Sequence, residues 1–298
     1  MQAPYRDYLI PVFTALVLVW AAGNADCGEL EVDNLRGSDQ QSVEPGLASR
    51  SPFRTIQRAI DRASVGDVIS IRNTGQPYRE SISINSNHAL GAPGFPLVID
   101  GNDATLEGAK PLGVLDWTAI GRDLFELNVR SPGYVTLLAA SDQPIPEYLG
   151  HRADLASLAP LQYARNNGSV FFRAQPGEVP QTYGLRVGTE QTGLTLYDVS
   201  NIVIRNLNIV GYRLDGINCH GLVSEVRFEN IVSKHNGRSG ISVGGASQVS
   251  LQTGRLQHNG ESQARAEGHS ELKLIDVIIE AGKGKAMDQV GGRVIVSR

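Results

Sequence analysis

The side chains best suited to chemistry lie near the end of the chain, at Arg265, Glu267 and Asp288. If they lie on strands, the alternation of side chains places all three on the outward face. Glu267 and Asp288 fall in neighbouring repeats and are offset by one outward position, so we expect their backbones to be roughly 8 Å apart. An inverting glycosidase holds its acid and base within that range, and Arg265 beside them could hold a uronate carboxylate. These three are the candidate catalytic residues.

A second interpretation of the same residues is open. Exposed acidic and basic side chains on a repeat protein usually form only its solvated surface. A shift of one residue in the strand register would also turn every side chain to the opposite face. The catalytic hypothesis therefore depends on the alignment of the repeats.

Three further residues are candidates for binding a substrate: Asp215, Asn218 and His220. Asn218 shares its outward column with Arg265, and His220 shares a column with Glu267. Asp215 stands just before the same strand, in an Asp-Gly pair that is also typical of a turn entering a strand.

Two other columns have a structural explanation. His235 and His258 each stand in a His-Asn-Gly sequence, which is an ordinary turn composition, and two histidines alone do not make a metal site. We therefore predict stacked turn residues there and assign no metal ligand. Asn206 and Asn230 also share a column, for which we predict an asparagine ladder between neighbouring repeats.

All of these residues are positioned by a repeat of about 23 residues that begins at Asn201, Glu225, Gln248 and Glu271, with a fifth unit starting at Val294. Apolar residues alternate with polar ones in each unit, which is the period of a half-buried strand. One apolar column contains Ile202, Val226, Val249, Leu272 and Val294. A second contains Ile204, Phe228, Leu251, Leu274 and Val296. Such registered columns indicate a solenoid, in which each unit buries its apolar face against its neighbours.

The units favour an all-β solenoid. No unit carries a helical period, and the columns hold β-branched and aromatic residues beside leucine, which argues against a leucine-rich repeat. Gly- and Asn-containing turns join the strands. We predict a right-handed parallel β-helix, with a β-sandwich as the alternative.

The rest of the chain divides into segments of different character. Residues 1–25 combine Arg6, an apolar run and small residues at a cleavage position, which predicts a signal peptide and a secreted or periplasmic protein, with an uncleaved anchor as the alternative. Residues 26–50 form a polar lead-in. Residues 51–109 hold a capping helix, starting at Ser51 and ending at Gly66, and the first coils. Residues 110–190 lose the period and predict an irregular β insertion, and 191–298 hold the regular coils.

Composition excludes several classes of function. The net charge is −4, which offers no basic stripe for nucleic acid. The two cysteines, Cys27 and Cys219, do not make a disulfide framework. After removal of the signal peptide, no membrane association is expected.

The segments SPFRTIQRAIDRASVGDVISI, PLVIDG and LTLYDVSNIVIRNLNIVGYRLDGI resemble bacterial secreted proteins of the right-handed parallel β-helix, pectate-lyase-like superfamily. The resemblance implies a polysaccharide partner and makes calcium a conceivable cofactor, although no cluster of aspartate ligands is visible. Arg213-Leu214-Asp215-Gly216-Ile217 is similar to part of the polygalacturonase NTDGI motif. The Asp-Asp pair and the Arg-Ile-Lys signature that accompany the motif in that family are missing.

Two functions are therefore expected. The first is an exported polysaccharide lyase or glycoside hydrolase. The second is a non-catalytic β-helix that binds glycan or a cell-surface partner along its side. The last coil lacks a capping segment, and uncovered strand edges can associate, so self-association through this coil is a further expectation.

Overall fold

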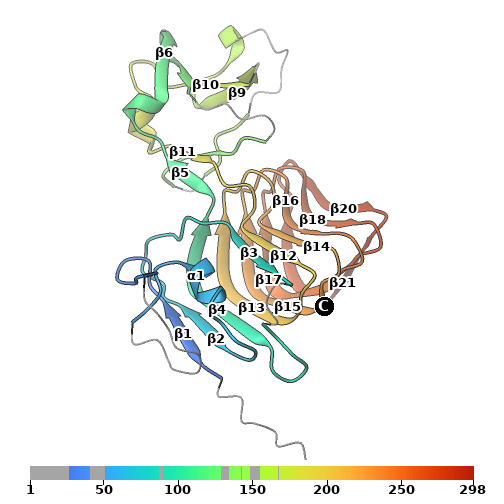
Figure 1. Ribbon diagram of the computed structural model, residues 1–298. Helices are drawn as coiled ribbons and strands as arrows, with labels where there is room; N and C mark the ends of the chain where they lie inside the picture. The colour runs from blue at the N-terminus through green and yellow to red at the C-terminus, as the bar shows by residue number, and fades with distance from the viewer. Residues whose placement is uncertain are drawn as a thin grey trace, which may run out of the picture.

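The computed structural model describes residues 27–40, 51–86, 90–128, 134–141, 143–147, 155–166 and 168–298. Its main body is a coil of stacked parallel strands (Figure 1). An eight-stranded sheet has the order β1 (Glu29–Val32), β2 (Val68–Ile71), β4 (Leu97–Glu107), β13 (Ser200–Val210), β15 (Ser224–Lys234), β17 (Gln248–Gln257), β19 (Glu271–Glu280) and β21 (Arg293–Ser297). A six-stranded sheet has the order β20 (Lys285–Val290), β18 (Ser262–Glu267), β16 (Ser239–Val243), β14 (Ile217–His220), β12 (Leu194–Tyr197) and β3 (Ile82–Asn85).

The apolar columns read from the sequence are stacked in register. Ile204 pairs with Phe228, Phe228 with Leu251, Leu251 with Leu274, and Leu274 with Val296. The column that starts at Ile202 is equally continuous. Nearly all of these side chains join one core that runs along the coil axis. The predicted parallel β-helix is confirmed, because each strand buries its apolar face against the strand before and after it.

The long strands of the eight-stranded sheet bend midway, at a column of residues with left-handed backbone. Asn206, Asn230, Thr253 and Asp276 have φ values of 53°, 50°, 52° and 52°. Asparagine and aspartate tolerate this conformation better than most residues, because their short polar side chains can form local hydrogen bonds. Asn230 Nδ2 donates to Asn206 Oδ1 at 2.9 Å, and Asn206 Nδ2 donates to Asp100 Oδ1 at 2.9 Å. The predicted asparagine ladder is confirmed.

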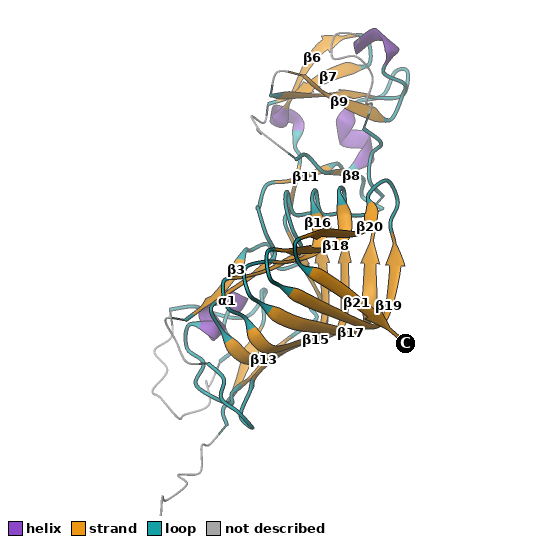
Figure 2. Cartoon of the chain, turned by 90° about the vertical axis from the view of Figure 1, so that its right-hand side faces the viewer, coloured by secondary structure: helices purple, strands orange, loops and turns teal. Residues whose placement is uncertain are grey.

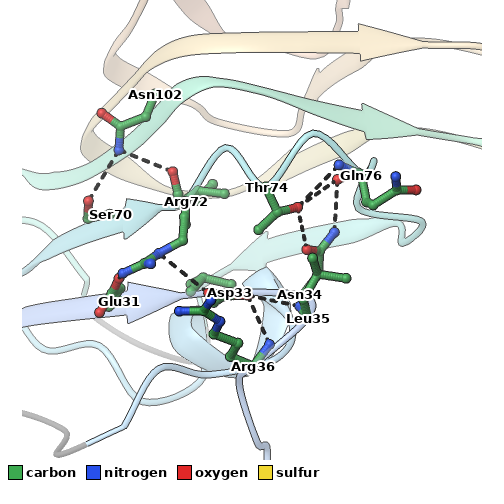
Figure 3. A network of polar contacts seen from close by, with 12 residues as sticks. Glu31, Asp33, Asn34, Leu35, Arg36, Ser70, Arg72, Thr74, Gln76 and Asn102 are labelled. Carbon is green, nitrogen blue, oxygen red and sulfur yellow. Dashed lines mark hydrogen bonds and ion pairs between the residues drawn. The ribbon is translucent and has the colours of Figure 1, made fainter.

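The polar segment near the N-terminus contains the first rung of the large sheet. Strand β1 pairs in parallel with β2. A network of polar contacts holds the loop after β1 in place (Figure 3). Asp33 accepts the backbone N–H groups of Leu35 and Arg36 at 2.9 Å each, and Tyr78 donates its hydroxyl to the carbonyl of Arg72 at 2.8 Å. The sequence predicts only a polar lead-in here, because β1 is too short to show a period.

The single α-helix of the described residues, α1 (Ile56–Ile60), is shorter than predicted. It begins after Thr55, whose side chain accepts the N–H of Arg58, and not after Ser51. The residues before it are extended, because Phe53 forms a parallel bridge with Val32. The helix ends at Asp61, well before Gly66. Its buried residues join the main core and it contacts β1, β2 and β3; that it covers the open end of the coil stays a prediction.

The segment between the early and the late coils forms a separate lobe beyond the turns of the coil (Figure 2). An antiparallel sheet has the order β6 (Trp117–Gly121), β7 (Leu124–Leu127), β10 (Ser169–Arg173) and β9 (Gln162–Asn166). A three-stranded sheet of β5 (Ala109–Pro111), β11 (Arg186–Gly188) and β8 (Leu137–Leu138) connects it to the coil. The lobe has its own apolar core. At the junction the buried carboxylate of Glu107 lies between Arg79 (2.9 Å) and Arg186 (3.1 Å).

The last coil leaves apolar side chains exposed. Met287, Val290, Ile295 and Val296 are at least partly open to solvent. Self-association at this surface stays a prediction. In the described part of the chain, no helix is long and apolar enough to cross a membrane. The predicted signal peptide lies outside the described residues.

Candidate functional site

The outward face of the six-stranded sheet carries two columns of side chains that run along the coil axis; we call them the outer strip. The first column contains Thr195, Asn218, Ser242, Arg265 and Asp288. The second contains Tyr197, His220, Gly244, Glu267 and Val290. Every register pair expected from the sequence in the first column is observed, from Asn218 to Asp288. The outer strip therefore brings together five of the six residues expected to be catalytic or substrate-binding: Asn218, His220, Arg265, Glu267 and Asp288.

Arg265 joins the two candidate catalytic carboxylates. Its guanidinium is 2.5 Å from Glu267 Oε1 and 2.5 Å from Asp288 Oδ2. Lys285 contributes a further charge, with Nζ 2.7 Å from Asp288 Oδ1. The hydrogen bond from Lys285, together with the positive charges of Lys285 and Arg265, outweighs the effect of burial and lowers the pKa of Asp288 below its usual value. Asp288 is thus ionised at neutral pH, as a base or a hydrogen-bond acceptor requires.

Asp215 lies behind the outer strip and not on it. Its side chain is fully buried and forms an ion pair with Arg238, whose Nε is 3.0 Å from Asp215 Oδ1. This differs from the expected contact with substrate, because the carboxylate points into the protein. The hydrogen bond and charge of Asp215 raise the pKa of Arg238. Asp215 therefore positions Arg238 at the edge of the surface.

An aromatic pair occupies the other end of the outer strip. The rings of Tyr197 and His220 are stacked, with centroids 6.2 Å apart and planes 29° from parallel. Tyr197 is 47% exposed. The next position in the column is Gly244, where an added Cβ would lie 2.7 Å from His220 Nδ1. Tyr197 is a site residue that was not expected from the sequence, although it stands in the same column as His220 once β12 is aligned.

The turns that precede the outer strip hold the predicted histidine stack. The rings of His235 and His258 are 5.7 Å apart and within 9° of parallel. Beneath them, buried Asn236 and Asn259 form their own ladder, with Asn236 Nδ2 donating to Asn259 Oδ1 at 2.9 Å. Within the described ranges, no group of three or more His, Cys, Asp or Glu side chains is arranged to hold a metal ion.

A groove separates these turns from the inserted lobe; we call it the lobe groove. Its volume is about 580 Å³. One wall consists of coil turns, at 235–237, 258–261 and 282–283, and the other of lobe segments 134–137 and 144–147 with Tyr163 and Arg165. Tyr134 donates its hydroxyl to Glu261 across the groove. Burial and the Glu261 carboxylate raise the pKa of Tyr134, so the hydroxyl keeps its proton at neutral pH.

Comparison with known proteins agrees on the fold. No protein-family model matches the sequence, and the search of curated proteins found no significant match. A solved structure described as "Glycoside hydrolase" is similar with a TM-score of 0.54 and 12% identity, covering 89% of this chain and 74% of the other. The complex of XylC with xylose gives a TM-score of 0.49, 10% identity and coverages of 90% and 70%. Pectate lyase Pel9A gives a TM-score of 0.31, 10% identity and coverages of 93% and 80%.

The chain is thus a parallel β-helix protein. The fold is similar to that of the solved structure described as "Glycoside hydrolase". At identities of 10–12% these similarities describe the fold alone.

Proposed function

We propose that this protein binds a polysaccharide along the outer strip, with the sugar chain parallel to the coil axis. The observation that carries the proposal is the order of side chains in the two columns. The stacked pair of Tyr197 and His220 stands at one end, small residues at Ser242 and Gly244 in the middle, and the charged group around Arg265 at the other end.

Each part of the outer strip suits a different feature of a sugar chain. The exposed Tyr197 ring presents an apolar face together with a polar hydroxyl, and such amphipathic rings suit a partner with both apolar and polar surfaces. Ser242 and Gly244 in the middle of the strip are small and buried, so no bulky side chain separates its two ends. The ionised groups around Arg265 form strong hydrogen bonds with neutral hydroxyls.

The charge balance of the strip favours a neutral glycan. The positive charges of Arg265 and Lys285 are balanced by the negative charges of Glu267 and Asp288, so the cluster has no net charge. A uronate would have to displace one of the two carboxylates that already hold Arg265. We therefore infer that neutral glycans bind better than polyuronates.

Binding can be tested by affinity electrophoresis and calorimetry with neutral and anionic polysaccharides. Replacing Tyr197 by Ala removes the aromatic end, and the expected loss is roughly tenfold in affinity. Phe95→Ala, another exposed aromatic outside the outer strip, serves as a control that should leave binding unchanged. If no polysaccharide binds, or if the two variants bind equally well, the proposal fails.

A second candidate function is glycoside hydrolysis with Glu267 and Asp288 as the reacting carboxylates. The observation that favours it is that one guanidinium holds both carboxylates, from neighbouring coils, at 2.5 Å. The lowered pKa of Asp288 suits a base or nucleophile. Glu267, which is paired with Arg265, would have to take up a proton before it could act as the acid. Glu267→Gln and Asp288→Asn should each abolish release of reducing sugar while binding persists. Wild-type protein that binds glycan without releasing sugar would instead support the non-catalytic function. Action outside the cytoplasm, and any role of calcium, remain predictions.

A further inference from the structure

The lobe groove opens beside the charged end of the outer strip. Tyr134, on the lobe wall, interacts electrostatically with Arg238 and Arg265. Glu261, which accepts the Tyr134 hydroxyl, directly precedes β18, the strand that carries Arg265 and Glu267. A glycan lying on the outer strip therefore reaches the mouth of the groove without leaving the surface.

The two walls of the groove differ in chemistry. The lobe wall carries an apolar strip, formed by Val135, Pro144, Ile145 and Pro146, beside the polar residues Tyr134, Glu147 and Arg165. The two charged residues of this wall form an ion pair with each other, since Arg165 Nε lies 2.5 Å from Glu147 Oε1. This wall therefore offers a sugar chain apolar contact and few free hydrogen-bonding groups.

The coil wall, in contrast, keeps donors available. Lys283 lies on this wall, is exposed, and takes part in no ion pair within the described part of the chain. His258, from the previous coil, is half-exposed, and its Nε2 is 3.7 Å from Glu280, which is longer than a normal hydrogen bond. An ammonium and an imidazole thus border the apolar surface on the opposite side.

An apolar wall that faces free donors complements a group with a carbonyl oxygen and a short apolar end. The volume of about 580 Å³ lies within the range of roughly 300–1,000 Å³ that is typical of small-ligand sites. A carboxylate substituent would match Lys283 but would have to lie against apolar side chains, where burial of a charge is costly. An acyl group satisfies both walls.

On this basis, and resting on the proposed glycan binding, we propose that the lobe groove binds acyl substituents of the glycan, with the acyl carbonyl accepting from Lys283 and the acyl methyl against the lobe wall. Ester-linked and amide-linked acetyl groups share this chemistry. The proposal assigns a role to the inserted lobe, which selects acylated from unacylated chains.

The test compares matched glycans that differ only in acylation. For the ester, acetylated glucomannan is compared with the same polymer after mild alkaline deacetylation. For the amide, chitopentaose is compared with cellopentaose, which has the same linkage and length. We expect one of the acetylated members to bind about tenfold more tightly, which is the effect of one hydrogen bond from a charged donor. The pair that shows the preference identifies the linkage.

Variants locate the preference in the groove. Lys283→Ala should reduce the acetyl preference to near unity without changing the affinity for the deacetylated glycan. Pro146→Ser, on the lobe wall, should weaken the acetyl preference, because it replaces an apolar contact for the acyl methyl by a polar one. Lys273→Ala, on the outer surface of the large sheet, should have no effect. Circular dichroism and thermal midpoints show whether each variant remains folded.

The possible failures are distinct. If no polysaccharide binds at all, the proposed function fails together with this inference. If other polysaccharides bind but none of these four does, this inference alone fails. If acetylated and deacetylated members bind equally, or if the preference survives in both Lys283→Ala and Pro146→Ser, the assignment of the lobe groove is overturned while glycan binding stands.

Discussion

The carboxylate of Asp215 lies fully buried beneath the guanidinium of Arg238, which it holds through both of its oxygens. The pair connects two neighbouring coils, because Asp215 precedes β14 and Arg238 precedes β16. Arg238 in turn lies close to Tyr134 of the lobe and Glu267 of the outer strip. Asp215, which was expected to contact substrate, is thus an interior residue that positions the guanidinium of Arg238.

Asp215→Asn should lower the free energy of unfolding by about 2 kcal/mol, because the Arg238 guanidinium loses its charged partner. Urea unfolding followed by circular dichroism measures the loss. Asp276→Asn is the matched control, because Asp276 is exposed and asparagine also tolerates its left-handed backbone conformation. Equal stability of the two variants would show that the buried pair contributes nothing.

Asp33 should make stability depend on acid pH. Burial alone would raise its pKa, but the backbone N–H groups of Arg36 and Leu35 and the charge of Arg72 lower the pKa below its usual value. The pKa of the Asp33 carboxyl is therefore lower in the folded protein than in the unfolded chain, where it is about 3.9. The stabilisation is present above that pH and is lost as the pH falls through the folded pKa. The stability difference between wild type and Asp33→Asn should shrink as the pH falls from about 5 to 2; a difference that is independent of pH contradicts this assignment.

Tyr78 should make stability depend on alkaline pH. Burial raises the pKa of its hydroxyl to about 12, and the hydroxyl donates to the carbonyl of Arg72. The unfolded tyrosine ionises near pH 10, so stability should fall as the pH rises between about 10 and 12. Buried Tyr163 and Tyr212 have raised pKa values for the same reason and add to the effect. Tyr78→Phe should flatten part of the alkaline decline, measured by urea unfolding at each pH. An ultraviolet titration in which Tyr78 ionises near pH 10 in the folded protein would contradict the prediction.

Gly244→Ala should weaken glycan binding through the neighbouring imidazole. The added Cβ would lie 2.7 Å from His220 Nδ1, so the ring must move away from its place beside Tyr197. We expect roughly a fivefold loss of affinity, corresponding to about 1 kcal/mol, with little change in thermal midpoint. Gly113→Ala, where the nearest atom to the added Cβ is 3.8 Å away, is the control. Unchanged affinity would remove His220 from the binding surface.

The coil and the register of its late strands can be predicted from the sequence. Side chains in a strand alternate with a period of two, and each coil pairs only with its neighbours, so the column of Ile204, Phe228 and Leu251 could be read directly. The same alignment places Arg265 beside Asp288, as the structure shows. Local patterns sufficed because the contacts they predict recur at a constant separation.

Contacts that do not follow this period could not be predicted from the sequence. Tyr134 and Glu261 are separated by 127 positions and meet only because the inserted lobe folds over the turns of the coil. The burial of Asp215 depends on Arg238 from the next coil, and an Asp-Gly pair in the sequence is equally consistent with an exposed turn. Long-range contacts of this kind arise from the packing of whole elements against one another, which no local period encodes.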